Sequence, residues 1–571
     1  HIMGVLLGME EQHQEAILHF KQAIKVNPNH NLVHFNLAKA LSETGDDAIA
    51  LKHHMTATRL APKHAEAWLN YGRSLSKLTK FEEAIKCYNK ALQLNPNLME
   101  ALSNKGAAFN DLGRFEEALA IFDQAININS NHAETWSNKA IAHGELKQFD
   151  FAFSCYDKAI ELKHDYAVAW SNKGASLKEL KRFQEAIACY DHVIQLAPDF
   201  VEAWVNKADA LDEIKCYDEA LECYEKAIEL NPNFYCLQGH YLHGKNKKCD
   251  WINFESDIMQ CELKVRSGIK AVSPFIGLSL FDDATLQLMI ARSFASEARF
   301  SAPPNQRKIS KKSANEKIRV AYFSPEFYNH PISFLIAELI ELHDRNKFEV
   351  YGFSLGPDVD DGMRRRLCKG FDRFIDVSKK SPREIIAICD DLNVDIAVDL
   401  CGYTGLARLE LFAQRVAPIQ VSYLGFIGTS GCSFMDYIIA DEIVIPKTDV
   451  VNFTEKVIYL PQCYQVSDSK RKVSDRVFTR EELGLPQEGI VYCCFNGSYK
   501  IRPKTFDLWM RILQRVESSV LWLLDDNQFV IEALRKEARL RGVDPQRLIF
   551  AARVENKDYL ARFKAADLFL D

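Results

Sequence analysis

The sequence of 571 residues has no strong net charge and no long apolar run. Its 71 Lys and Arg are nearly balanced by 78 Asp and Glu, which gives a formal net charge of −7. The chain therefore lacks the basic excess of a nucleic-acid-binding protein. No apolar stretch reaches the roughly 20 residues that a bilayer span requires. We expect a protein that binds neither nucleic acid nor membrane.

The sequence also lacks a secretory signal and a zinc-ligand pattern. It begins with His1-Ile2-Met3, which is typical of an expression tag, and no charged segment followed by an apolar core comes next. We therefore expect the natural N-terminus to lie outside the chain. No CxxC pair has a partner pair at zinc spacing, and several of the 15 cysteines recur on a repeat, as Cys155 and Cys189 do. We expect no metal site, inert thiols and a cytoplasmic location.

What the sequence does contain is a repeat of 34 residues. Prolines recur on this spacing at Pro28, Pro62, Pro96, Pro198 and Pro232. Within each repeat a small residue precedes a ring by four positions, as Ala84 precedes Tyr88. Because residues four apart share one helix face, the pattern predicts stacked helix pairs. It resembles the tetratricopeptide repeat family, with six full repeats over residues 31–234 and the second helix of an earlier one. This implies an α-helical superhelix over 1–234 with a peptide-binding groove.

One asparagine recurs in all six repeats, on the first helix of each pair. The series is Asn36, Asn70, Asn104, Asn138, Asn172 and Asn206. Asparagine is unfavourable inside a helix, and its amide both donates and accepts hydrogen bonds. We interpret the series as a ladder that holds the backbone of a bound peptide. The alternative is a structural link between adjacent repeats, or a residue inherited from one ancestral repeat.

Residues 235–316 comprise a helical connector, to about residue 300, and a basic linker, 301–316. After them, short apolar runs alternate with amphipathic helices. The predicted strands are 318–324, 348–355, 394–400, 419–426, 437–444, 457–460, 490–495, 520–524 and 548–552. The predicted helices are 334–343, 383–392, 504–516 and 529–541. Strands that are apolar on both faces indicate parallel sheets covered by helices on both sides. We expect an α/β region of two Rossmann-like lobes, 317–468 and 469–571, the second incomplete.

Five motifs lie in and around the turns after these strands. They are Glu326-Phe-Tyr-Asn-His330-Pro, Gly402-Tyr-Thr404, Leu424-Gly425-Phe-Ile-Gly428-Thr-Ser-Gly431, Met435-Asp-Tyr-Ile-Ile-Ala-Asp441 and Phe495-Asn-Gly-Ser-Tyr-Lys500. Glycines expose backbone N–H groups to a ligand, and a lysine near a helix start can neutralise phosphate. Together with the repeats, the motifs resemble the O-linked N-acetylglucosamine transferase and SPINDLY family, in a bacterial-type form.

The resemblance implies a two-lobed glycosyltransferase of the GT-B type that needs no metal and no cofactor. It implies transfer of N-acetylglucosamine, with inversion, from UDP-N-acetylglucosamine to Ser or Thr of a protein presented by the repeats. Two alternatives stay open: a protein O-fucosyltransferase that uses GDP-fucose, and a noncatalytic scaffold whose repeats bind peptides. Assembly into a homo-oligomer through the repeats is also left open.

The same resemblance assigns catalytic roles to four residues. Lys500 matches a lysine that contacts the donor pyrophosphate, and His330 matches a histidine of the sugar and phosphate site. Glu326 stands where relatives carry an aspartate proposed as the base, so its carboxylate is displaced by one methylene. His243 matches another active-site histidine within a thin local similarity. Glu326, His330 and His243 therefore remain alternative proton acceptors.

Five further residues are implied in donor binding. Leu424 and Gly425 match backbone contacts around the sugar, and Thr404 lies in the glycine-containing turn after a strand. Tyr559 and Arg562 match a helix that contacts the nucleoside, although Tyr559 replaces a histidine. A glycine, Gly497, also replaces a polar residue of the family. The nucleotide base is accordingly left open.

The last residues, Leu568-Phe-Leu-Asp571, fall inside a predicted strand of the second lobe. Family members continue beyond this point with a turn whose His and Thr residues contact the donor phosphates. We therefore expect weaker donor binding by the chain as given, and we leave open whether the part beyond residue 571 is needed for activity.

Overall fold

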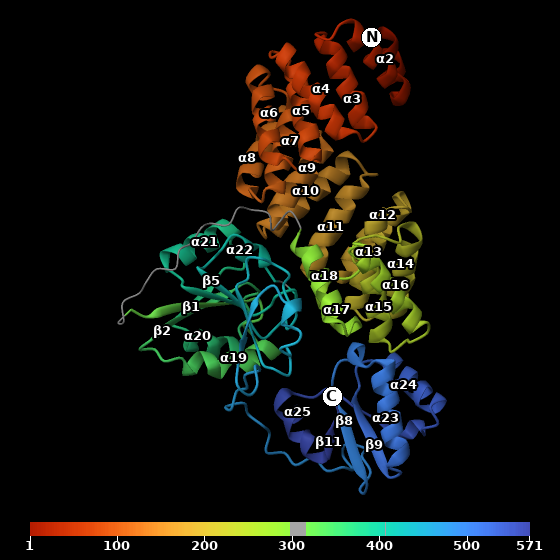
Figure 1. Cartoon of the computed structure of the whole chain (residues 1–571), viewed down its shortest axis with the longest axis vertical. Coiled ribbons are helices and arrows are strands. Elements are labelled where there is room, and N and C mark those ends of the chain that lie inside the picture. The colour runs from red at the N-terminus through yellow and green to blue at the C-terminus, as the bar shows by residue number, and fades with distance from the viewer. Residues whose placement is uncertain (297–315, 406, 571) are drawn as a thin grey trace. The chain divides into compact units, whose positions relative to one another are not determined.

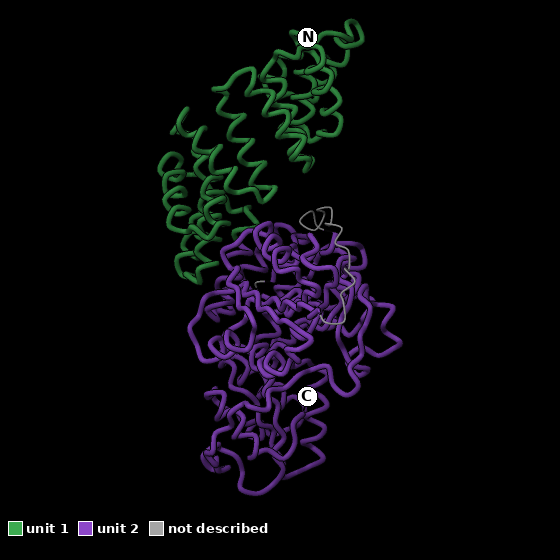
Figure 2. Tube along the Cα trace, turned by 90° about the vertical axis from the view of Figure 1, so that its left-hand side faces the viewer, with its two compact units in different colours: residues 1–203 green, residues 204–571 purple. Residues whose placement is uncertain are grey.

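The structure is a computed structural model that describes residues 1–296, 316–405 and 407–570. It divides into two compact units, residues 1–203 and 204–571, which Figure 2 shows in separate colours. The linker predicted at 301–316 lies outside the described residues except for Glu316. Among the described residues, no helix is both long and apolar enough to cross a membrane.

The predicted repeats are pairs of antiparallel helices (Figure 1). These helices are α1 Ile2–Met9, α2 His13–Val26, α3 Asn31–Glu43, α4 Asp47–Leu60, α5 Ala65–Lys77, α6 Phe81–Leu94, α7 Met99–Asp111, α8 Phe115–Ile128, α9 Ala133–Glu145, α10 Phe149–Leu162, α11 Ala167–Glu179, α12 Phe183–Leu196, α13 Val201–Glu213 and α14 Tyr217–Leu230. The prediction of a helical repeat is confirmed.

In the first unit, several helix pairs pack where the ring of the second helix covers a glycine of the first. A β-carbon on Gly72 would lie 2.4 Å from the ring of Tyr88, and one on Gly106 would lie equally close to Phe122. The rings thus occupy the space that a larger residue would need. The prediction found only the second helix of the earliest repeat, because α1 holds too few repeat positions; Gly4 on α1 lies beneath the ring of Phe20 in the same way.

The turn inside each helix pair contains one residue with positive φ. These residues are Glu11, Gly45, Thr79, Gly113, Lys147, Lys181 and Lys215, and they follow the same spacing of the repeat. Only two of the seven are glycines, although glycine adopts this conformation most readily. The positive φ at these turns therefore could not be predicted from glycines in the sequence. Packing of the two helices imposes the conformation.

Four helices connect the repeats to the α/β region. They are α15 Leu237–Lys247, α16 Phe254–Arg266, α17 Pro274–Leu280 and α18 Ala284–Ala295. They enclose their own apolar core, which includes Leu242, Leu280 and Ile290. The short helix α15 carries His243, and the loop after it brings Trp251 against Phe506 of the second lobe, with 5.4 Å between ring centroids.

The first lobe is a seven-stranded parallel sheet of order β3-β2-β1-β4-β5-β6-β7. Its elements are β1 Ile318–Ser324, α19 Pro331–Leu342, β2 Phe348–Ser354, α20 Gly362–Gly370, β3 Arg373–Asp376, α21 Pro382–Asp391, β4 Ile396–Asp399, α22 Leu409–Ala413, β5 Ile419–Ser422, β6 Tyr437–Ala440, η2 Val450–Asn452 and β7 Lys456–Tyr459. Helices α19 and α20 cover one face, and α21 and α22 cover the other (Figure 1). The predicted parallel sheet with helices on both faces is confirmed.

The second lobe is a four-stranded parallel sheet of order β10-β9-β8-β11. Its elements are β8 Ile490–Cys494, η3 Ser498–Lys500, α23 Pro503–Arg515, β9 Ser519–Leu524, α24 Gln528–Leu540, η4 Pro545–Arg547, β10 Leu548–Ala551, α25 Asn556–Arg562, η5 Phe563–Ala565 and β11 Leu568–Phe569. Helices α23 and α24 pack on one face, and α25 and η5 pack on the other.

Candidate functional site

The turns that carry the predicted residues of the first lobe leave one edge of its sheet. Strands β1 and β4 are neighbours although the chain runs from β1 to β2, so the strand order reverses between them. Ligands of parallel sheets bind at such a switch point, beyond the carboxyl ends of the strands. The turn after β1 carries Glu326 and His330, the turn after β4 carries Thr404, and the turn after β5 carries Leu424 and Gly425.

Glu326 and His330 form a close, half-buried pair. Nδ1 of His330 lies 3.1 Å from Oε2 of Glu326, and it accepts the N–H of Ile332 at 3.4 Å, which caps α19. Burial raises the pKa of Glu326 to about 7 and lowers the pKa of His330. A proton on the Glu326 carboxyl can form a hydrogen bond to Nδ1 of His330. Because the pKa of this carboxyl is about 7, the pair can take up or release a proton near neutral pH.

This pair makes the stability of the lobe depend on pH. Because the pKa of Glu326 is raised in the folded state, its contribution to stability is present below about pH 4.5 and is lost as the pH rises through about 7. Glu326→Gln removes this titration. We therefore expect the wild-type chain to lose thermal stability relative to Glu326→Gln as the pH rises across this range.

Thermal unfolding at a series of pH values measures this difference. Glu442→Gln is the control, because Glu442 is an exposed glutamate of the same lobe whose partner is the surface residue Lys447. The control should follow the wild-type pH profile. If the unfolding temperatures of wild type and Glu326→Gln changed with pH in the same way, the raised pKa of Glu326 would be contradicted.

Leu424 and Gly425 form a tight turn against β4. Leu424 is buried with a φ of 72°, a left-handed conformation that costs a leucine about 1–2 kcal/mol. A β-carbon on Gly425 would lie 2.0 Å from the carbonyl oxygen of Leu400, so the backbones approach too closely for any other residue. Strained backbone of this kind is concentrated at ligand-binding sites, which favours a functional role for the turn.

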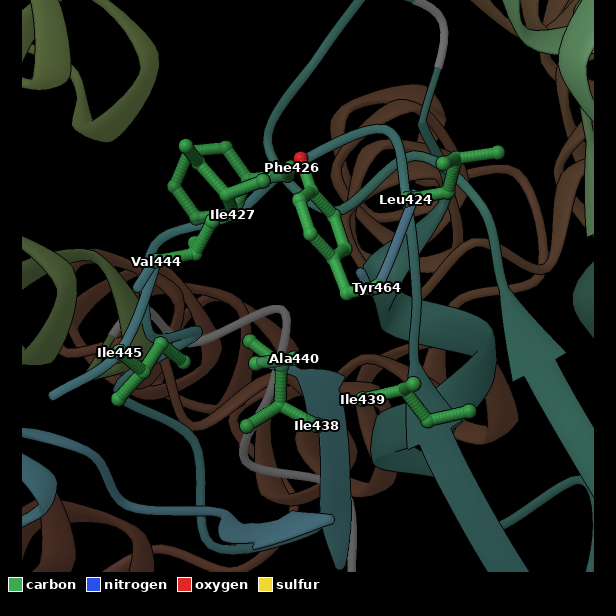
Figure 3. A pocket seen from close by; sticks show the side chains of 9 residues that line it. All are labelled: Leu424, Phe426, Ile427, Ile438, Ile439, Ala440, Val444, Ile445 and Tyr464. Carbon is green, nitrogen blue, oxygen red and sulfur yellow. The ribbon is translucent and has the colours of Figure 1, made fainter. Parts of the chain in front are cut away.

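Apolar side chains support this turn from behind. Figure 3 shows residues of the turn, of β6 and of the segments after it gathered around one hollow. The lining residues are Leu424, Phe426, Ile427, Ile438, Ile439, Ala440, Val444, Ile445 and Tyr464. The hollow has no room for a water molecule, so we interpret it as a packed wall and not as a ligand site.

Thr404 lies in a turn organised by a buried aspartate that the sequence analysis missed. Asp399, 4% exposed at the end of β4, accepts the backbone N–H groups of Cys401 and Gly402 at 3.0 Å each. Burial raises the pKa of Asp399 to about 6, although these two hydrogen bonds oppose the shift. Thr404 Oγ1 donates to the Cys401 carbonyl at 2.8 Å. The sequence could have indicated this role, because Asp399 is the charged residue at the end of an apolar strand, just before Cys401-Gly402.

In the second lobe, Lys500 is exposed at the end of η3, and its neighbour Tyr499 packs against His243. The two rings are 4.9 Å apart between centroids. Burial lowers the pKa of His243 to about 3, and its Nδ1 is buried with no hydrogen-bond partner among the described residues. The structure therefore places a neutral imidazole beside the loop that carries Lys500.

Arg562 is a buried cation among aromatic rings. It is 2% exposed, and its guanidinium carbon lies 4.4 Å from the ring centroid of Phe495 and 5.1 Å from that of Tyr559. Nη1 donates to the Ala552 carbonyl at 2.6 Å, whereas Nε and Nη2 have no partner within the described part of the chain. Burial lowers the pKa of Arg562. Unpaired buried donors are costly, so this position suits a further acceptor.

The predicted residues of the α/β region thus form two groups. One is at the switch point of the first sheet, and the other joins α15 to the second lobe. Across the described ranges, no hydrogen bond or ion pair joins these two groups. In the same ranges, no cluster of three or more His, Cys, Asp or Glu could hold a metal ion.

The asparagine series lies on the first helices of the repeats, and every member is partly exposed. Asn138 lines a cavity of about 200 Å³ between α7 and α9. Its neighbours there include Asn110, whose Nδ2 donates to the Asn138 carbonyl at 2.9 Å, and the carboxylates of Asp111 and Glu145. Within the described residues of this cavity, the Asn138 amide makes no hydrogen bond to the protein. The role of the series as a peptide ladder stays a prediction.

Fold and site together define a helical repeat protein with an α/β region of two parallel sheets. Residues 298–476 and 472–571 match Glycosyl transferase family 41. Residues 65–98, 97–165, 167–200 and 201–234 match tetratricopeptide repeat families. The chain thus combines tetratricopeptide repeats with a glycosyl transferase family 41 domain, as the resemblance implied.

Two curated relatives are named as peptide N-acetylglucosaminyltransferases. The chain is 33% identical over 349 residues to the probable UDP-N-acetylglucosamine–peptide N-acetylglucosaminyltransferase SEC of Arabidopsis thaliana, with 58% of this chain and 36% of the relative covered. It is 26% identical over 404 residues to the UDP-N-acetylglucosamine–peptide N-acetylglucosaminyltransferase of Caenorhabditis elegans, with 51% and 34% covered. The chain therefore spans about a third of the length of these relatives.

A solved structure shares the fold. It is a mutant O-GlcNAc transferase of Thermobaculum terrenum, which superposes with a TM-score of 0.54 at 22% identity. The match covers 77% of this chain and 78% of the other. At this identity the likeness concerns the fold alone.

Proposed function

We propose that this chain is a protein O-glycosyltransferase that transfers N-acetylglucosamine from UDP-N-acetylglucosamine to Ser or Thr side chains. The observation that carries the proposal is the Glu326–His330 pair at the switch point of the first sheet, 3.1 Å apart and able to exchange a proton near neutral pH. The family 41 match and the names of the relatives support the donor and the acceptor class. The GT-B arrangement and a cytoplasmic location belong to the same proposal.

In the proposed reaction, the acceptor hydroxyl attacks the anomeric carbon, and the nucleoside diphosphate leaves with the bonding electrons. A base takes the hydroxyl proton, and it works best with a pKa near the operating pH. The raised pKa of Glu326 favours the Glu326–His330 pair for this role over His243, whose pKa of about 3 makes it a weak base. Lys500 stabilises the charge that develops on the diphosphate, with no metal or cofactor required.

The repeats supply the acceptor. Asn138 and its neighbours line a cavity with hydrogen-bonding amides and carboxylates, which suits an extended peptide backbone. We include the asparagine series in the proposal as the element that holds the peptide without reading its side chains.

Calorimetric titration with UDP and with GDP tests the donor. We expect the chain to bind UDP at least about tenfold more tightly than GDP, a difference of about 1.4 kcal/mol. Affinity should be the same with and without added magnesium. Binding of GDP alone would replace the proposal with a fucosyltransferase, and binding of neither would favour the peptide-binding scaffold.

A further inference from the structure

One buried serine fastens the Lys500 loop to the helix that carries His243. Ser498 is 2% exposed, and its hydroxyl lies 2.9 Å from the backbone carbonyl of Lys247, the last residue of α15. The same hydroxyl lies 2.8 Å from Oδ2 of Asp526, which also accepts the Ser498 N–H at 3.3 Å. The hydroxyl has a single proton, which it shares between these two acceptors from different parts of the chain.

Neighbouring contacts hold the same junction. Asn527 Nδ2 donates to the Lys247 carbonyl at 3.3 Å, and Arg553 pairs with Asp526 at 2.7 Å. Burial opposes ionisation of Asp526, but the hydrogen bonds from Arg553 and Ser498 outweigh it and lower the pKa of this carboxyl. Asp526 is thus a charged, fixed acceptor for the Ser498 hydroxyl.

The junction also reaches the last repeat. The Lys247 side chain forms an ion pair with Asp212 on α13, the helix that carries Asn206. Lys247 therefore contacts α13 through its side chain and the Lys500 loop through its carbonyl. Its position on α15 is one turn after His243, so both residues share one face of the helix.

We propose that Ser498 is a positioning residue for the donor diphosphate, acting through Lys500 and His243. This inference rests on the proposed function. The Lys500 side chain is exposed, and within the described residues it has no ion pair, so its place depends on the backbone of η3. Ser498 fixes that backbone against α15 and thereby sets the distance between the cation and the imidazole. A displacement of about 1 Å in such a group costs on the order of 100-fold in rate.

Ser498→Ala tests the inference, with Ser519→Ala as the matched control. Ser519 is 1% exposed in the same lobe, and its hydroxyl also has two partners: it donates to the Val516 carbonyl at 2.7 Å and accepts from Arg547 Nη2 at 3.0 Å, both away from α15. Both variants lose a buried hydroxyl, so both lose similar stability. The readout is the affinity for UDP, measured by calorimetry, against the affinity for uridine, measured by ligand-observed NMR. Hydrogen exchange over residues 237–249 gives a second readout.

We expect Ser498→Ala to weaken UDP binding about tenfold, to leave uridine binding unchanged, and to speed exchange over 237–249. Ser519→Ala should change none of the three. Equal UDP affinities of wild type and Ser498→Ala overturn the positioning role, and so does an equal loss of UDP and uridine binding, which reports general destabilisation. A wild-type chain that binds neither ligand overturns the proposed function, and the positioning role falls with it.

Discussion

Replacing Lys500 with alanine is expected to lower UDP affinity at least tenfold and sugar transfer by about 10²–10³-fold. Lys500 follows the second lobe's first strand, β8, at the end of η3, and its ammonium is exposed to solvent. A cation at this point stabilises the ground-state diphosphate and, more strongly, the additional negative charge of the leaving group. The rate should therefore fall more than the affinity.

Lys504→Ala is the matched control for this experiment. Lys504 lies four residues further along at the start of α23, and its side chain is 86% exposed. It shares the lobe, the charge and the general electrostatic field, so a non-specific effect of charge would weaken both variants equally. Equal UDP affinities for Lys500→Ala and Lys504→Ala would contradict the phosphate assignment.

The parts of the fold that the sequence predicted are those that depend on local or periodic patterns. The helix pairs follow a spacing of 34 residues, and most strands are apolar runs between polar turns, so their existence needed no long-range information. The strand β3 was missed because it has only four residues, lies at the sheet edge and has two half-buried residues between two exposed ones. Helix α20 was missed because Arg364, Arg365 and Arg366 obscure its apolar face.

In the candidate site too, residues that belong to a local motif were predicted, and residues that depend on long-range contacts were not. Glu326 and His330 were identified from one motif, and they are only four residues apart in the chain. Ser498 meets Lys247 across 251 positions, a contact that no local pattern encodes. The role of Asp399 likewise depends on burial beneath the turn it organises, and its residue type alone does not reveal that burial. Tertiary packing, in these cases, turns an ordinary residue into part of the site.

Gly425→Ala is expected to destabilise the first lobe strongly and to abolish donor binding. The added methyl group would lie 2.0 Å from the Leu400 carbonyl oxygen, which belongs to the backbone after β4 and cannot rotate away. Relief of this clash must move the turn that holds Leu424 in its strained conformation. Overpacking of this kind costs about 1–3 kcal/mol, and we expect the upper end because the neighbour is backbone. Thermal unfolding and UDP titration measure the two effects.

Gly362→Ala provides the control, because it adds the same methyl group where nothing lies within 4 Å. Gly362 is the first residue of α20 in the same lobe, and alanine is the better helix former, so this variant should be neutral or slightly stabilising. For a lobe of this size, the expected cost of Gly425→Ala lowers the unfolding midpoint by roughly 5–10 °C. If Gly425→Ala kept the stability and the UDP affinity of the wild type, the turn would be able to relax around the added methyl group. The assignment of the Leu424–Gly425 backbone to the donor site would then be wrong.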